Sequence, residues 1–317
     1  MKRSLAALPI LLAVFLATPL RAQSPARHAP RPPGEVLPNG GGGLRLSATL
    51  TQNDPQSLKA GLHWRIFDDS AEPNGSHRLV AESSEANPTI ALPDGAYVVH
   101  AGFGLAGATR RVVVDGHVAQ ERIVLNAGGL KLIDKLGDAT IPPQRLSISI
   151  YVPERNNSEA KLVLANARGG DVISLPEGSY HIVATLLDLS GATPGENNAT
   201  NSVVTADLRV TAGKLIEATL RHRAATMTLK LVNAPGGEAL ANTSFSVLTP
   251  GGDVIRELIG AFPALVLAEG EYVAIARHDG KTYQNTFKVA STKDADVEIV
   301  VGKGPEKPDA AEPEGVQ

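Results

Sequence analysis

Leu92-Pro93-Asp94-Gly95-Ala96-Tyr97 is a phrase that recurs further along the chain. It returns as Leu175-Pro176-Glu177-Gly178-Ser179-Tyr180 and, with alanine in place of proline, as Leu267-Ala268-Glu269-Gly270-Glu271-Tyr272. The three tyrosines are 83 and 92 residues apart, from position 97 to 180 and from 180 to 272. This spacing is too long for a solenoid repeat and close to the size of a small β-sandwich. The recurrence predicts three similar domains in tandem.

Each residue type in the phrase has an expected structural role. A proline or an acidic residue starts a turn, glycine permits a positive φ angle, and tyrosine begins the next strand. We therefore predict that the recurring residues form a structural motif and that the chain has no catalytic residue. The motif consists of Leu92, Pro93, Gly95 and Tyr97, then Leu175, Pro176, Gly178 and Tyr180, and finally Leu267, Gly270 and Tyr272.

Around the phrase, apolar residues alternate with polar ones, which places successive side chains on opposite faces of an extended strand. We expect opening strands at 44–50, 130–132 and 227–232, second strands at 63–67, 146–151 and 244–248, and third strands at 97–101, 180–184 and 272–276. Each domain is expected to close with a hairpin, as at 110–114 and 121–125 around Asp115-Gly116, and the third copy ends with 286–289 and 296–301. No segment predicts a long helix.

The Leu-Pro-x-Gly-x-Tyr turn and its alternating strand resemble the prealbumin-like, or carboxypeptidase-regulatory-like, β-sandwich modules of exported bacterial proteins. Immunoglobulin-like adhesin modules and starch-binding-like domains use a similar turn. The resemblance covers all three copies, although Ala268 departs from the pattern. It implies accessory modules that space, support or bind, with no family active-site residue to carry over.

The predicted fold class is therefore all-β, with three tandem immunoglobulin-like or prealbumin-like antiparallel β-sandwich domains and disordered termini. We place the domains at 44–127, 128–224 and 225–302. Short connections near Ala127-Gly128-Gly129 and Arg223-Ala224-Ala225 favour limited motion between them.

The first residues have the three parts of a secretory signal. Lys2 and Arg3 precede an apolar core from Leu5 to Leu16, and small residues follow as far as Ala22. We predict a signal peptide at 1–22, a Pro/Gly-rich linker at 23–43 and a disordered tail at 303–317. The apolar core is too short to span a bilayer, so no transmembrane span is expected after cleavage. The predicted location is the periplasm or the exterior of the cell.

Charge and cysteine content narrow the possible partners. The 30 basic and 33 acidic residues are mixed along the chain, with a net charge of −3, so nucleic acid is not an expected partner. The chain contains no cysteine, which excludes disulfides and a lipid-modified cysteine.

The candidate metal and cofactor sites lack the residue spacing that such sites require. The histidines show none of the local pairs that bind metals, and we interpret His63, His100 and His181 as outward-facing strand residues. Asp68–Gly75 lacks the alternating oxygen ligands of a calcium loop and is interpreted as a strand connection. Gly40–Gly43 follows a proline-rich stretch and is assigned to the linker. We predict no cofactor.

Three segments of the sequence remain candidates for binding a polymer, a protein or a glycan. Arg221-His222-Arg223 could contact an anionic polymer, but we favour a solvated hinge. The Leu186–Ser202 insertion is either a recognition loop or a flexible insertion. Tyr283 is a candidate exposed aromatic residue, although the chain has too few aromatic residues to favour glycan binding.

These observations predict a non-catalytic exported envelope protein that acts as a scaffold or protein-interaction module through its loops and edge strands. The expected partner is another envelope protein. The alternative is a periplasmic ligand-binding or glycan-binding accessory protein, or a hydrolase with a site at a domain interface. A deep cleft with converging acidic and histidine side chains would favour the alternative.

Overall fold

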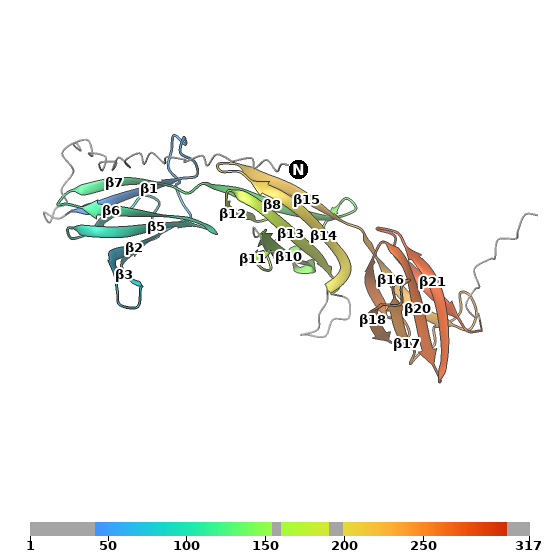
Figure 1. The fold of residues 1–317 in the computed structure, drawn as a ribbon. Coiled ribbons are helices and arrows are strands. Elements are labelled where there is room, and N and C mark those ends of the chain that lie inside the picture. The colour runs from blue at the N-terminus through green and yellow to red at the C-terminus, as the bar shows by residue number, and fades with distance from the viewer. Residues whose placement is uncertain (1–41, 154–159, 190–198, 303–317) are drawn as a thin grey trace, which may run out of the picture. The chain divides into compact units, whose positions relative to one another are not determined.

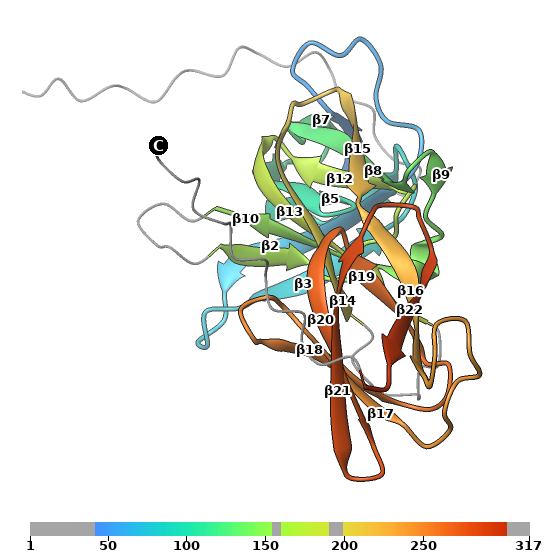
Figure 2. The ribbon, with the colours of Figure 1, turned by 90° about the vertical axis from the view of Figure 1, so that its right-hand side faces the viewer.

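The computed structural model describes residues 42–153, 160–189 and 199–302. These residues form 22 strands, β1 to β22, and one short 3-10 turn, η1 (Pro143–Arg145). The strands assemble into six sheets that pair as three successive β-sandwiches (Figures 1 and 2). This confirms the predicted all-β fold class. The predicted signal peptide, the tail and nearly all of the linker lie outside the described residues. Gly43, assigned to the linker, is instead the first residue of β1.

Sandwich 1 contains the first seven strands. They are β1 (Gly43–Thr49), β2 (Leu62–Ala71), β3 (His77–Ser83), β4 (Thr89–Ala91), β5 (Gly95–Phe103), β6 (Ala106–Val114) and β7 (Val118–Val124). The smaller sheet has the order β4-β1-β7, and the larger has the order β3-β2-β5-β6.

Sandwich 2 has the same strand connectivity, with the additional short strand β9. Its strands are β8 (Ala127–Leu136), β9 (Ala139–Thr140), β10 (Leu146–Val152), β11 (Lys161–Leu164), β12 (Val172–Pro176), β13 (Gly178–Leu187), β14 (Ala199–Val210) and β15 (Leu215–His222). The sheet equivalent to the smaller sheet of sandwich 1 has the order β12-β8-β15, with the two-residue strand β9 paired to β8, and the equivalent of the larger sheet has the order β11-β10-β13-β14.

Sandwich 3 has the same strand connectivity as sandwich 1. Its strands are β16 (Ala224–Val232), β17 (Ser244–Leu248), β18 (Val254–Ile259), β19 (Ala264–Ala268), β20 (Gly270–His278), β21 (Lys281–Val289) and β22 (Ala295–Val300). The sheet orders are β19-β16-β22 and β18-β17-β20-β21.

The last strand of each sandwich pairs in parallel with the first. In sandwich 1, β7 lies beside β1 in a register that runs from Gly43 opposite Val118 to Thr49 opposite Val124. β15 pairs in the same way with β8, and β22 with β16. The predicted closing hairpins are therefore wrong, because β6 and β7 belong to different sheets. A short turn between two alternating strands can join either hairpin partners or strands of facing sheets, so spacing alone cannot distinguish them.

Each sandwich has its own hydrophobic core, and the alternating positions supply it. The first core draws on residues from Leu44 to Ala127, with Trp64 fully buried, and the third draws on residues from Ala225 to Ile299. The second extends from Leu130 to Ala224 and also includes Val266 of β19. One edge strand of sandwich 3 therefore packs against the core of sandwich 2.

The connections between the sandwiches are very short. Leu125 and Asn126 join β7 to β8, and Arg223 alone joins β15 to β16. The residues predicted as connectors, 127–129 and 224–225, are strand residues in the structure. Within the described residues, no helix is long and apolar enough to cross a membrane.

Candidate functional site

The repeated phrase forms the crossover between the two sheets of each sandwich. It carries the chain from the smaller to the larger sheet, from β4 to β5, from β12 to β13 and from β19 to β20. Glu177 alone separates β12 from β13, and Glu269 alone separates β19 from β20. The phrase leucines Leu92, Leu175 and Leu267 are buried in their respective cores. The phrase therefore fixes one sheet to the other.

The phrase tyrosines brace this crossover. The Tyr97 hydroxyl donates a hydrogen bond to the Pro93 carbonyl at 2.9 Å. The equivalent bonds, from Tyr180 to the Pro176 carbonyl and from Tyr272 to the Ala268 carbonyl, are both 2.8 Å long. Desolvation by burial raises the pKa of all three hydroxyls above the ordinary tyrosine value. A neutral hydroxyl four residues after the carbonyl it binds is thus common to the three copies.

The phrase glycines have a different role from the predicted one. Gly95, Gly178 and Gly270 do not adopt positive φ angles, so the expectation of a left-handed turn is wrong. A Cβ atom added at Gly95 would lie 3.5 Å from the Tyr97 hydroxyl oxygen, and its other near neighbours are ring atoms of the same tyrosine. The glycine therefore lies directly under the tyrosine ring.

The acidic residue of the phrase also has a recurring role that the sequence reasoning missed. Asp94 accepts a hydrogen bond from the backbone N–H of Gly116 at 2.6 Å, and Glu177 accepts one from Ala212 at 3.4 Å. The pKa of Glu269 is lowered mainly by its hydrogen bond with the Arg223 side chain, and a backbone hydrogen bond from Ser291 adds to this. In each sandwich the carboxylate holds the turn before the last strand. The recurrence of an acidic residue at this position in all three copies was the sequence signal that could have predicted this role.

The other sequence candidates show no converging site. His63 is exposed, His100 is half-buried, and His181 is paired with Asp207 at 2.8 Å on the surface of sandwich 2. Asp68–Ala71 extends β2 and is not part of a connection, and Tyr283 is half-buried against the third core. The described residues contain no group of three or more potential metal ligands.

His222 contradicts the solvated-hinge prediction. Its side chain is fully buried, whereas the Arg223 side chain is 72% exposed. Its Nε2 lies 3.4 Å from Asp134 Oδ1, and its Nδ1 lies 3.2 Å from Ser202 Oγ. The reason is the period of two: His222 is the last residue of β15 and points inward, while Arg221 before it points outward.

Ser202, His222 and Asp134 thus form a chain of hydroxyl, imidazole and carboxylate in the order used by serine hydrolases. However, Ser202 is only 4% exposed and His222 only 1%, so a substrate carbonyl has no room beside the Ser202 oxygen. The second oxygen of Asp134 has no hydrogen-bond partner among the described residues. The arrangement fits a buried polar link that joins β8, β14 and β15.

The Leu186–Ser202 insertion is only partly a loop. Leu186 and Leu187 continue β13, and Ala199–Ser202 begin β14. Asp188 is buried. Residues 190–198 of the insertion lie outside the described residues. The ends of the insertion therefore belong to the sandwich, and they face sandwich 3.

The two ends of the insertion provide hydrogen-bond acceptors for the unpaired edge of β19. β19 is an edge strand, and its Val266 and Ala268 N–H groups point away from β16. Asp188 Oδ2 accepts the Val266 N–H at 2.9 Å, and Asn201 Oδ1 accepts the Ala268 N–H at 2.8 Å. The Asn201 amide also donates to the Tyr272 hydroxyl at 2.8 Å. Side chains of sandwich 2 thus take the place of a neighbouring strand for sandwich 3.

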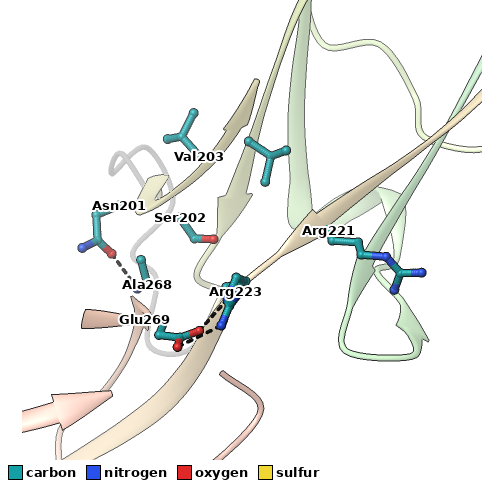
Figure 3. Close-up of a pocket in the computed structure, with 8 residues that line it drawn as sticks. Asn201, Ser202, Val203, Arg221, Arg223, Ala268 and Glu269 are labelled. Atoms are coloured by element: carbon teal, nitrogen blue, oxygen red, sulfur yellow. Dashed lines mark hydrogen bonds and ion pairs between the residues drawn. The ribbon is translucent and has the colours of Figure 1, made fainter. Parts of the chain in front are cut away.

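A shallow groove of about 460 Å³ lies at this junction. Its lining consists of Asn201, Ser202, Val203, Val204, Arg221, Arg223, Ala268 and Glu269. Figure 3 shows the Asn201 side chain directed at Ala268 and the Arg223 guanidinium against the Glu269 carboxylate, at N–O distances of 2.6 and 3.0 Å. This bond raises the pKa of Arg223 and lowers that of Glu269. No histidine lines the groove, and its one carboxylate is already paired.

One protein-family model matches the chain. It describes a Rhizobiales growth-associated tandem repeat domain, and it covers residues 226–301, which correspond to sandwich 3. No curated protein matches the chain in sequence.

Several solved structures are similar to the chain. The Bacillus anthracis TIE protein is 16% identical, with a TM-score of 0.24, and the match covers 81% of this chain and 50% of that protein. A streptococcal ancillary pilin is 13% identical, with a TM-score of 0.28, and the match covers 83% of this chain and 99% of the pilin. The shaft pilin SpaA from Lactobacillus rhamnosus GG is 12% identical, with a TM-score of 0.27 and coverages of 55% and 97%. This chain spans half the length of the Bacillus anthracis protein.

Proposed function

We propose that this chain is a non-catalytic, exported scaffold of the cell envelope in which sandwich 2 holds sandwich 3 in a fixed orientation. The observation that carries this proposal is the capping of β19 by Asp188 and Asn201. Hydrogen bonds across a junction resist its opening most where they are buried, as the bond from Val266 to Asp188 is, because opening leaves the buried groups unpaired until water replaces the partner. A fixed junction suits a protein that holds other molecules at defined positions.

The features of the groove support a structural rather than a catalytic role. Its carboxylate, Glu269, is bonded to Arg223 and to the backbone of the same sandwich. Its hydroxyl, Ser202, is buried. The match of sandwich 3 to a tandem repeat model agrees with a protein built from repeated modules. Another envelope protein is the partner we expect, and the periplasm or the cell exterior is the location we propose.

Trypsin cleavage at Arg223 tests the fixed junction. Arg223 is the one residue between β15 and β16, and its side chain is exposed, so cleavage there reports local opening. We expect slow cleavage in the native chain. The double variant Asp188→Ala, Asn201→Ala should be cleaved about tenfold faster, since an opening equilibrium shifted by about 1.4 kcal/mol changes tenfold.

The matched control is Asp207→Ala, which removes an exposed carboxylate from β14 outside the junction. It should leave cleavage at Arg223 unchanged. Equal rates in the native chain and the double variant would contradict the proposed fixed junction. For export, fractionation of cells that express the chain with and without residues 1–22 should show loss of envelope localisation in the shortened form. Retention of that localisation would contradict export by the predicted signal.

A further inference from the structure

The two junctions between sandwiches use equivalent positions of the repeat. One partner is the residue eight positions after the phrase tyrosine, which lies one or two residues beyond the end of the strand that contains the tyrosine. The other is the residue just before the phrase leucine of the next sandwich, in the edge strand of its smaller sheet. In both cases the end of this strand in one sandwich meets the edge strand of the next.

At the first junction the partners are Leu105 and Ser174. The Leu105 N–H donates a hydrogen bond to the Ser174 carbonyl at 3.0 Å. Gly104 precedes Leu105 in the turn between β5 and β6, and a Cβ atom added there would lie only 2.9 Å from the Ser174 Cβ. At the second junction the equivalent residues are Asp188 and Val266, but the edge strand is the donor there: the Val266 N–H donates to Asp188 Oδ2 at 2.9 Å.

The equivalent strand end of sandwich 3 and the equivalent edge strand of sandwich 1 have no partner sandwich among the described residues. In sandwich 3, the hairpin β20–β21 turns through Asp279 and Gly280, between His278 and Lys281. This loop has the same length as the loop of Gly104 and Leu105, and Gly280 is the residue eight positions after Tyr272. The Asp279 side chain is 88% exposed. Figure 2 shows β20 and β21 side by side.

In sandwich 1, the equivalent edge strand is β4, and the residue before Leu92 is Ala91. The Leu92 N–H donates to the Gly42 carbonyl, and the Pro88 carbonyl accepts from Leu46, so these residues bond toward the interior of the sheet. The N–H and C=O of Ala91, between them, point outward. Ala91 is exposed, and no hydrogen bond to these two groups is formed within the described part of the chain.

We propose that β4 of one copy receives the β20–β21 hairpin tip of a second copy, with the Gly280 N–H donating to the Ala91 carbonyl. The chain would then associate end to end at the positions that join sandwich 1 to sandwich 2, with a small shift because Asp279 has a Cβ atom where Gly104 has none. The inference rests on the proposed scaffold function, because it names a second copy as one partner of the scaffold. Within one chain, the peptide connection keeps neighbouring sandwiches at a high effective concentration relative to each other. Two separate copies lack this connection, so their association is weaker than either junction inside the chain.

Cysteine pairing tests this contact directly, because the native chain has no cysteine. The variants Ala91→Cys and Asp279→Cys are mixed as full-length chains under oxidised glutathione. Asp279 occupies the position of Gly104, whose added Cβ would approach the Cβ of the edge strand, so a disulfide can form with small adjustments. The control mixture pairs Asp279→Cys with Val113→Cys, which places a thiol at another exposed position, on β6.

The expected result is that the Ala91–Asp279 pair forms a mixed dimer about tenfold faster than the control pair, because docking raises the local thiol concentration. Sedimentation velocity provides a second readout: Asp279→Gly, which restores the residue found in the first hairpin, should shift the chain toward larger species.

Equal dimer rates for the two mixtures would overturn the proposal. A mixed dimer that forms only after removal of residues 1–41 would also overturn it, because β4 would then be occupied by the chain itself. Either result, together with slow trypsin cleavage at Arg223, would leave the scaffold function standing without self-association.

Discussion

Asn201 of sandwich 2 donates a hydrogen bond to the Tyr272 hydroxyl of sandwich 3 at 2.8 Å. The same amide accepts the Ala268 N–H at 2.8 Å, and the Tyr272 hydroxyl donates to the Ala268 carbonyl. The three residues close a ring of hydrogen bonds. This ring explains the departure of the third copy from the phrase: a proline at position 268 has no N–H to offer to Asn201.

Ala268→Pro should therefore destabilise sandwich 3, although it restores the phrase of the other copies. Asn201 is solvent-exposed, so the loss of this bond costs about 0.5–1.5 kcal/mol. Proline at a position whose N–H is hydrogen-bonded destabilises by more than the about 0.4–1 kcal/mol that it gains from the reduced freedom of the unfolded chain. Urea unfolding measures the net change. The control Asn201→Ala, Ala268→Pro should add little to Asn201→Ala alone, and full additivity would contradict the ring.

Tyr97→Phe and Tyr180→Phe should each lower the free energy of unfolding by about 1–2 kcal/mol, because each leaves a crossover carbonyl without its donor. Tyr283→Phe is the matched control, since Tyr283 lies outside the phrase and is only half-buried. Thermal or urea unfolding of the three variants gives the comparison. Equal small effects at all three positions would show that the hydroxyl bond is not important to the crossover.

Alkaline pH should destabilise the sandwiches. Burial raises the folded-state pKa of Tyr180 above the unfolded value of 10.0, so the unfolded chain loses its phenol proton first. The stabilising contribution is complete below pH 10 and is lost as the pH rises through the folded-state pKa. Urea midpoints measured across this interval should fall, and Tyr180→Phe should reduce the slope. An unchanged slope in this variant would contradict the assignment.

His222→Leu should be strongly destabilising, by about 3–5 kcal/mol, because it leaves the buried carboxylate of Asp134 without its partner. Arg221→Ala, at the exposed neighbouring position, should change stability by less than about 0.5 kcal/mol. The double variant Asp134→Leu, His222→Leu should recover most of the loss, as replacement of a buried pair by apolar groups is often neutral. Urea unfolding of the set tests this, and equal losses in the single and double variants would refute the pairing.

The sequence predicted the repeat and most strands because both depend on local pattern. Leu92, Leu175 and Leu267 recur with the tyrosines, and the period of two places most inward-facing residues correctly. A predicted strand that reached His222 would also have placed this residue inside, because the alternation of β15 makes its last residue inward-facing. The phrase acids Asp94, Glu177 and Glu269 were visible in all three copies, but their role depends on a turn more than 20 residues away.

Other features could not be predicted from local pattern. The parallel pairing of β7 with β1 joins residues more than 70 positions apart, and a short turn fits either sheet. Asp188 and Asn201 read as parts of a polar insertion, because their partners Val266 and Ala268 lie in the next sandwich. The junction becomes visible only when β19 is known to be an edge strand.

The distance between sandwiches 2 and 3 tests the central claim most directly. Nitroxide labels on Leu162→Cys and Val254→Cys, both at exposed positions, give this distance distribution by pulsed electron resonance. The account predicts one narrow distribution in the native background and a broad one when Asp188 and Asn201 are both replaced by alanine. A distribution equally broad in both would contradict a scaffold held rigid at this junction.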